Sequence, residues 1–204
     1  MQLDSAEYKM ISVTLKTPGQ IQVLLSDEGQ EGWHVQAVGS SFLFLGRTPG
    51  AKLETQIVSI TLRSPKAILG IIEDQNRGGW RLGSLGSNYL FFNRDLGEAG
   101  PLDFEYKMEN IILKTPGGIL EMANGYGENG WEIKGIGASL MVMQRRTDKS
   151  MPRRHLLENI TLKTPAALQD LVAKKASAGW SLSGVSRLFM AFSQPRSLSE
   201  RAAE

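Results

Sequence analysis

Basic residues occupy four corresponding positions in this sequence, at Lys16, Arg63, Lys114 and Lys163. Each one stands directly before Thr-Pro or Ser-Pro, a pair that is typical of the start of a helix. Backbone N–H groups at a helix start carry partial positive charge and favour anions. The four positions could therefore form a surface that binds phosphate groups or nucleic acid. The simpler interpretation is that each is a solvated charge at the end of a strand.

A second basic group lies further along the chain, at Arg145, Arg146, Lys149, Arg153 and Arg154. It reflects an uneven charge distribution, because residues 1–143 hold 12 Lys and Arg against 16 Asp and Glu, whereas residues 144–204 hold 11 against 5. Such a cluster attracts phosphate or another anionic surface. A solvated linker between two structural units is the alternative.

Tryptophan occurs four times, each time directly after glycine, in the pairs Gly32-Trp33, Gly79-Trp80, Gly130-Trp131 and Gly179-Trp180. Tryptophan rings can stack on nucleic-acid bases or form a cage around a ligand. Packing in the core or between units is the interpretation that we favour, because buried tryptophan contributes strongly to core stability. The glycines indicate a positive φ or a close backbone approach.

Residues for enzymatic chemistry are few. The absence of cysteine excludes thiolate nucleophiles, disulfides and cysteine-based zinc sites. The two histidines, His34 and His155, stand at positions that do not correspond, which leaves little material for a metal site or a catalytic triad. Acidic residues such as Asp27 and Glu28 fall on the polar face of a predicted helix. We therefore expect no enzyme, no cofactor and no metal.

All these positions belong to one internal repeat. Each tryptophan follows a proline by 15 residues, in the pairs Pro18 and Trp33, Pro65 and Trp80, Pro116 and Trp131, and Pro165 and Trp180. A fixed period indicates one supersecondary unit that is repeated along the chain.

Each copy predicts the order strand, helix, strand, strand. In the first copy Ile11, Val13 and Leu15 alternate with other residues, which predicts a strand that has these three on one face. A helix then starts at the Thr-Pro or Ser-Pro pair. We expect it to stop at a left-handed residue at Gly29, Asn76, Gly127 and Ala176. The strand that follows tryptophan loses its alternation after two apolar residues, which predicts a β-bulge.

The last strand of each copy is apolar on both sides, over residues 42–45, 89–92, 140–143 and 188–192. A half-exposed strand should instead alternate. One helix covers only one face of a three-stranded sheet, so the other face must meet another unit, in the same chain or in a second chain. A single unit is therefore not expected to be stable alone.

The four copies form two similar pairs. Glu7-Tyr8-Lys9-Met10 recurs as Glu105-Tyr106-Lys107-Met108. We predict an α+β fold of four β-α-β-β units with antiparallel sheets, arranged as two pseudo-symmetric lobes. The first lobe is 1–97, with units 1–48 and 52–97. The second is 103–194, with units 103–148 and 153–194, and a polar tail follows at 195–204.

The segment Gly127-Glu128-Asn129-Gly130-Trp131-Glu132-Ile133 resembles the end of a signature near Leu-x-x-Leu-Leu-x-x-x-Gly-x-x-Gly-Trp-Glu-Leu. That signature is typical of a family of small bacterial β-α-β-β domains of unknown function. The resemblance extends over nearly the whole chain in four copies. It implies a fold and no activity.

The N-terminal residues show neither the basic nor the apolar part of a secretory signal. No apolar run approaches the length of a membrane span. We therefore expect a cytoplasmic protein of bacterial type.

Our first hypothesis for the function is a non-enzymatic protein-interaction or assembly module, in which a partner or a second copy covers the apolar sheet faces. The alternative is nucleic-acid or phospholigand binding through the repeated basic residues and the 145–154 cluster, which predicts a steep salt dependence. A third idea is a sensor that holds a small apolar ligand between the lobes.

Overall fold

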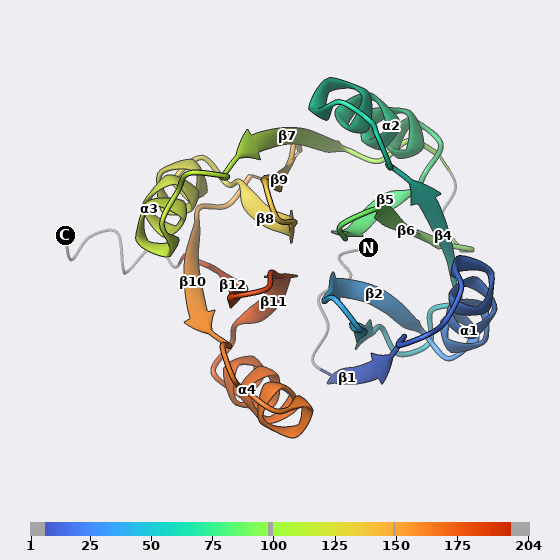
Figure 1. Ribbon diagram of the computed structural model, residues 1–204. Helices are drawn as coiled ribbons and strands as arrows, with labels where there is room; N and C mark the ends of the chain where they lie inside the picture. The colour runs from blue at the N-terminus through green and yellow to red at the C-terminus, as the bar shows by residue number, and fades with distance from the viewer. Residues whose placement is uncertain (1–6, 98–99, 149, 197–204) are drawn as a thin grey trace.

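A computed structural model describes residues 7–97, 100–148 and 150–196 of the chain. These residues form the predicted unit four times, in the order strand, helix, strand, strand (Figure 1). The α+β class with four β-α-β-β units is confirmed. Lys149 and residues 197–204 of the predicted tail lie outside the described residues.

The units have closely similar bounds. The first contains β1 (Glu7–Ser12), α1 (Pro18–Gln30), β2 (Trp33–Val38) and β3 (Phe42–Arg47). The second contains β4 (Leu53–Ser59), α2 (Pro65–Arg77), β5 (Arg81–Leu85) and β6 (Tyr89–Asp95). The third contains β7 (Phe104–Asn110), α3 (Pro116–Gly127), β8 (Glu132–Ile136) and β9 (Leu140–Arg146). The fourth contains β10 (Arg153–Asn159), α4 (Pro165–Ser177), β11 (Ser181–Val185) and β12 (Phe189–Pro195).

Each helix begins at the predicted proline because the residue before it caps the first turn. Thr17 Oγ1 accepts a hydrogen bond from the Gln20 N–H at 3.3 Å, and Gln20 Oε1 accepts one from the Thr17 N–H at 2.8 Å. This is a complete capping box. Ser64, Thr115 and Thr164 make the first of these two bonds in their own units.

The prediction that Leu15 shares a strand face with Ile11 and Val13 is wrong. The strand ends at Ser12, and a tight turn follows in which the Lys16 N–H donates to the Val13 carbonyl at 3.1 Å. Leu15 has φ 60° at the third position of this turn, and its side chain is 98% exposed. The corresponding leucines are equally exposed, namely Leu62 at 103%, Leu113 at 94% and Leu162 at 98%.

The predicted helix ends also need correction. Every helix continues to or past the expected stop residue. The left-handed residue that follows the helix is the glycine before tryptophan, with φ 82° at Gly32, 82° at Gly79, 78° at Gly130 and 81° at Gly179. These four glycines therefore reverse the chain between helix and strand, in a conformation that a Cβ would disfavour.

In the first three units the expected stop residue instead allows the helix to approach the next unit. A Cβ on Gly29 of α1 would collide with the carbonyl oxygen of Leu53 in β4. A Cβ on Gly127 of α3 would collide in the same way with the carbonyl oxygen of Arg153 in β10. Glycine is needed at these two positions because helix and strand backbones touch.

The second helix uses a side chain at this position. Asn76 Nδ2 donates to the carbonyl oxygens of Leu102 at 3.0 Å and of Phe104 at 3.2 Å. The amide thus satisfies backbone groups at the start of β7, an outer strand of the third sheet.

Each sheet has its third strand in the middle, as in the order β1-β3-β2. The predicted bulge occurs in the second strand of every unit, where the register shifts after Val35, Leu82, Ile133 and Leu182. The inner strands β2, β5, β8 and β11 contact one another around a central axis, and the helices lie on the outside (Figure 1).

The four units close into a ring. Each helix packs beside the first strand of the next unit, and α4 packs beside β1. The middle strands explain the two-sided apolar pattern: Leu43 and Leu45 of β3 join the core beneath α1, whereas Phe44 joins the core of the fourth unit. Because the apolar sheet faces are covered within one chain, they give no reason for self-association.

Two kinds of interface alternate around the ring. Tyr8 Oη accepts from a backbone N–H of β11 at 3.3 Å, and Tyr106 Oη accepts from one of β5 at 3.5 Å. Thr55 and His155 hold the corresponding positions in the second and fourth units. This alternation is the structural counterpart of the two similar pairs in the sequence.

Candidate functional site

The four tryptophans lie at the start of the inner strands and pack against the four cores. A basic side chain covers one face of each ring, at ring-centroid distances of 5.5 Å for Arg47 over Trp33, 4.4 Å for Arg94 over Trp80, 4.8 Å for Arg145 over Trp131 and 5.1 Å for Arg154 over Trp180. Tryptophan rings that are packed on one side and covered by a cation on the other contribute to the structure of the repeat.

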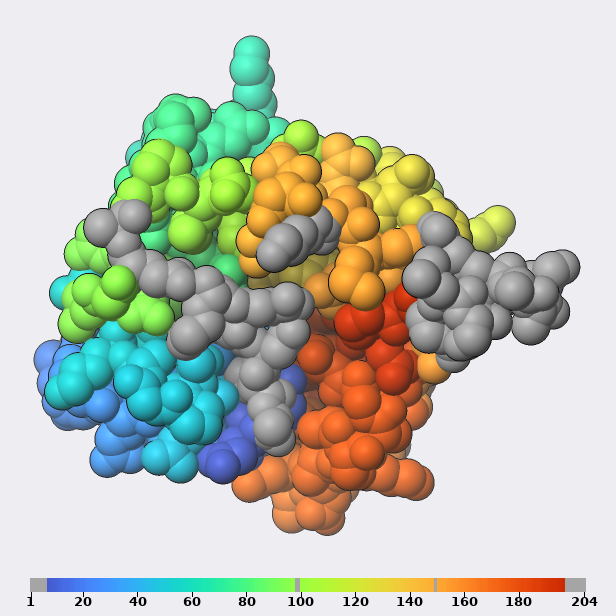
Figure 2. All heavy atoms as spheres, turned by 180° about the vertical axis from the view of Figure 1, so that it is seen from behind, coloured from blue at the N-terminus to red at the C-terminus, as the bar shows by residue number. Residues whose placement is uncertain are grey.

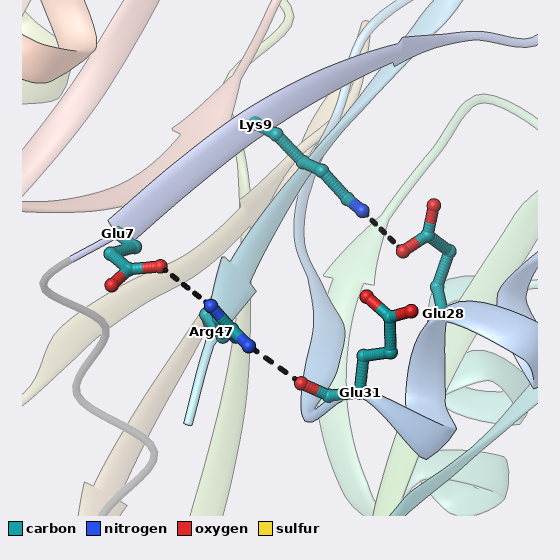
Figure 3. A network of polar contacts seen from close by, with 5 residues as sticks. All are labelled: Glu7, Lys9, Glu28, Glu31 and Arg47. Carbon is teal, nitrogen blue, oxygen red and sulfur yellow. Dashed lines mark hydrogen bonds and ion pairs between the residues drawn. The ribbon is translucent and has the colours of Figure 1, made fainter. Parts of the chain in front are cut away.

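A carboxylate holds each of the first three of these arginines. Arg47 binds Glu7 at 3.2 Å and the carbonyl oxygen of Glu31 at 3.3 Å, and Lys9 pairs with Glu28 close by (Figure 3). Arg94 and Arg145 bind Glu54 and Glu105 in the same way, each at 2.5 Å. In the fourth unit the arginine lies on the first strand, β10, and not on the third. There Arg154 donates to Gln194 of β12 at 2.8 Å.

The predicted basic cluster is therefore divided. Arg145 and Arg154 belong to the repeated cover over tryptophan, and the spacing of 14 residues from Trp33 to Arg47 and from Trp131 to Arg145 was a signal for this. Arg146 binds Asp148 at 2.7 Å, and Arg153 binds Glu132 at 2.9 Å.

The other predicted basic positions, Lys16, Arg63, Lys114 and Lys163, lie at one end of the ring. α1 runs antiparallel to the neighbouring strand β4, because Gln22 near its start bonds to Thr55 and Ile57, whereas Gly29 near its end approaches Leu53. The turn before α1 therefore lies at the same end as the turn after β4. The same relation recurs around the ring.

We call this end the turn face. It comprises the strand-to-helix turns with the first helical residues (13–20, 60–67, 111–118 and 160–167) and the adjacent hairpin turns (39–41, 86–88, 137–139 and 186–188). Backbone hydrogen bonds of 2.9 Å join each pair of turns, from Val13 to Ser41, Ile60 to Asn88, Ile111 to Ser139 and Ile160 to Leu188.

The opposite end carries the segments that connect consecutive units (Figure 2). It also carries Arg145, Arg146 and Arg153, which lie at the end of β9 and the start of β10. The two predicted basic groups consequently do not form one continuous surface.

Three of the four strand-to-helix turns at the turn face are strained by their leucines. A tight turn with positive φ at its third position normally has Gly or Asn there. Leu15 and Leu62 have φ 60° and Leu162 has φ 64°. A left-handed conformation costs a non-glycine residue about 1 kcal/mol. Neither packing nor backbone geometry accounts for leucine at these positions.

A polar cavity opens at the other end, near the central axis. Its volume is about 230 Å³, and all four inner strands contribute to it. We call it the axial pocket, and its charged and polar lining consists of Arg81, Glu132, Lys134, Arg145, Arg146, Arg153, Gln36, Gln144, Ser181, Ser183 and Ser193. Five basic residues and one carboxylate thus line the cavity, and three of the basic residues, Arg145, Arg146 and Arg153, are themselves paired with carboxylates.

The charged and polar lining residues of the inner strands come from positions where the repeat diverges. One residue after tryptophan the units have His34, Arg81, Glu132 and Ser181, and three residues after it they have Gln36, Gly83, Lys134 and Ser183. The position between them is buried and apolar in every unit. Alternation in a strand directs the variable positions toward the axis. Divergence at these positions is therefore a signal for the pocket in the sequence, whereas the shared apolar positions alone define the repeat and its core.

The pKa of His34 depends on burial and on the charges near the axis. Burial lowers its pKa to about 3, and the positive charges of Lys134 and Arg81 contribute to this shift. Lys134 is itself only 9% exposed. A buried cation is costly unless an opposite charge accompanies it. The charges of Lys134 and Arg81 both act on the buried His34 ring, which places two cations close to the axis.

Several buried polar atoms beside the axis have no partner among the described residues. Gln36 donates through Nε2 to the Leu182 carbonyl at 2.6 Å, but its Oε1 has no partner. Ser183 Oγ also lacks one. Buried polar groups are normally satisfied. An unpaired hydroxyl can donate a hydrogen bond to a bound oxyanion.

The second histidine lies apart from this pocket. His155 Nε2 lies 3.1 Å from the Trp131 carbonyl oxygen, and burial lowers its pKa to about 4. Over residues 7–97, 100–148 and 150–196, no group of three or more His, Asp or Glu could hold a metal ion. In the same ranges no helix has the length and apolar character needed to cross a bilayer.

No family model, curated protein or solved structure matches this chain. The repeat of four β-α-β-β units is present, while the resemblance to a family of small bacterial domains stays a prediction.

Proposed function

We propose that this protein is a non-enzymatic binding protein that takes a small phosphorylated ligand in the axial pocket. The observation that carries the proposal is the meeting of five basic residues and one carboxylate in a cavity of about 230 Å³. This space suits a small anion or one phosphorylated group better than a drug-sized molecule.

The chemistry of the lining supports an anion. Arg145, Arg146 and Arg153 already bind carboxylates of the protein, so they present oriented guanidinium groups at the wall. Arg81 and Lys134 approach from the inner strands β5 and β8. Charge-assisted hydrogen bonds from such groups are about twice as strong as neutral ones.

Binding of a small ligand fits better than binding of nucleic acid. The turn face and the axial pocket lie at opposite ends of the ring, so one strand of nucleic acid would not follow both basic groups. A non-catalytic role is supported by the two histidines, which are buried, separated and held neutral at pH 7 by lowered pKa values.

The test is calorimetric titration of the protein with inorganic pyrophosphate at low and high salt. We expect binding that weakens with salt, and a loss of roughly tenfold in affinity in Lys134→Gln because one charged contact is removed. Lys174→Gln is the matched control, since Lys174 is an exposed cation on α4 outside the pocket.

A second readout follows the His34 ring by NMR. Pyrophosphate in the axial pocket should raise the His34 pKa, because its charge offsets those of Lys134 and Arg81. Binding that Lys134→Gln leaves unchanged, with no effect on His34, would contradict the proposal.

A further inference from the structure

The turn face has a charge and side-chain composition unlike the rest of the protein. It holds six basic residues, namely Lys16, Arg63, Lys66, Lys114, Lys163 and Arg187, and no Asp or Glu. None of these six side chains is paired with another residue that the structure describes. At the opposite end, by contrast, arginines such as Arg47 and Arg94 are bound by carboxylates.

Apolar side chains project between these charges. Leu15, Leu62, Leu113 and Leu162 are almost completely exposed, and Ile112 beside Leu113 is 65% exposed. Solitary exposed leucines are common in proteins. Four at corresponding positions, three of them in a strained backbone conformation, are not explained by folding.

We propose that the turn face docks on an anionic lipid surface. Basic residues are attracted to anionic headgroups, and exposed apolar side chains enter the boundary between headgroups and acyl chains. The Ser and Thr hydroxyls of the same turns can bond to headgroup oxygens. This proposal is independent of ligand binding in the axial pocket.

The geometry favours a bilayer over an acidic protein. The leucines stand singly at the tips of four separate turns, and the axial pocket does not include residues of the turn face. A protein partner would need a pocket or groove for its central anchoring residues. A fluid and flat surface can instead accept four separate insertions at once, and their combined effect exceeds that of one.

Charge alone would also suit a nucleic acid. Contacts to a phosphate backbone, however, make no use of four apolar tips. The combination of a leucine and a basic residue at each turn is therefore the feature that favours a lipid surface over a nucleic acid.

The experiment is vesicle co-sedimentation of the full chain. Vesicles are made of phosphatidylcholine alone or of equal parts phosphatidylcholine and phosphatidylglycerol. We expect binding to the mixed vesicles only. Replacing Lys16 by Gln should lower the partition coefficient about fivefold, as for one cation near a charged surface.

The decisive variant is the quadruple substitution Leu15→Asn, Leu62→Asn, Leu113→Asn and Leu162→Asn. Asparagine tolerates positive φ, so the fold should be retained or stabilised. Vesicle binding should fall by roughly a hundredfold or more, because four insertions are lost together. Leu96→Asn is the control, since Leu96 is 50% exposed and lies at the opposite end.

Other outcomes would overturn the proposal. They are equal binding to neutral vesicles, no binding to either kind, and unchanged binding by the folded quadruple variant. Equal retention of the wild type and that variant by double-stranded DNA, without vesicle binding, would identify a purely electrostatic surface for polyanions.

Discussion

At the scale of single residues, the side chains that we propose for function are those that the fold does not need. Leu15 makes a turn less stable than Gly or Asn would, and Lys134 carries a charge into a nearly buried position. The pair of Trp33 and Arg47, by contrast, has counterparts in the other units, because each pair closes the edge of a core. Strain and buried charge therefore separate candidate functional residues from structural ones.

The buried histidines predict how stability depends on pH. The pKa of His34 is about 3 and that of His155 about 4 in the folded protein, below the ordinary value of 6.5. As pH falls below 6.5, the unfolded chain takes up protons that the folded chain does not, so the free energy of unfolding decreases. The slope approaches about 1.4 kcal/mol per pH unit for each histidine.

Urea unfolding between about pH 7 and about pH 5 measures this slope. His34→Gln should have a smaller slope than the wild type, whatever its stability at neutral pH. An identical slope in both proteins would show that His34 is not kept neutral by the fold.

At the scale of elements, the ring depends on how closely each helix approaches the next unit. α1 and α3 achieve this through glycine, whereas α2 uses the amide of Asn76. The helices themselves are fixed locally, by a capping hydroxyl, a proline and a left-handed glycine.

Two glycines of α3 give a matched test of this contact. Gly127→Ala should destabilise the protein by about 1–3 kcal/mol or more, because its Cβ would collide with the Arg153 carbonyl oxygen. Gly125→Ala should stabilise it by about 0.5–1 kcal/mol, since a Cβ there meets open space and alanine favours helix. Thermal and urea unfolding check both; equal effects of the two substitutions would contradict the close approach.

At the scale of the whole molecule, closure of the ring covers both faces of every middle strand. Phe44 of the first unit packs in the core of the fourth, which joins the two ends of the described chain. The two alternating kinds of interface also show that a pair of units is the larger repeat.

A fragment of residues 1–97 should therefore associate, because it leaves one helix side and one sheet face uncovered. Two copies can rebuild a four-unit ring. We expect a dimer of the fragment and a salt-insensitive monomer of the full chain by light scattering coupled to size exclusion. A stable monomeric fragment would indicate that each lobe forms a complete core alone.

Local sequence patterns are enough to define the unit and the number of its copies. The period from proline to tryptophan, the capping residues and the bulge are local features, so they follow from local rules of backbone geometry. The same rules misplaced Leu15, because a residue at the end of an alternating run has the same pattern in a strand as in a turn. They misjudged Gly29, because the reason for its missing side chain is a strand 24 residues later.

How the units combine became clear only from the folded chain. Two-sided apolar strands require a partner surface, but their pattern is the same whether that surface belongs to the same chain or to another. Closure by contact of α4 with β1 resolved this point. It also gave the basic residues of one sequence cluster different partners, and it brought Arg81 and Lys134, 53 residues apart, to a shared pocket. Such groupings depend on contacts between residues distant in sequence, and no local pattern records them.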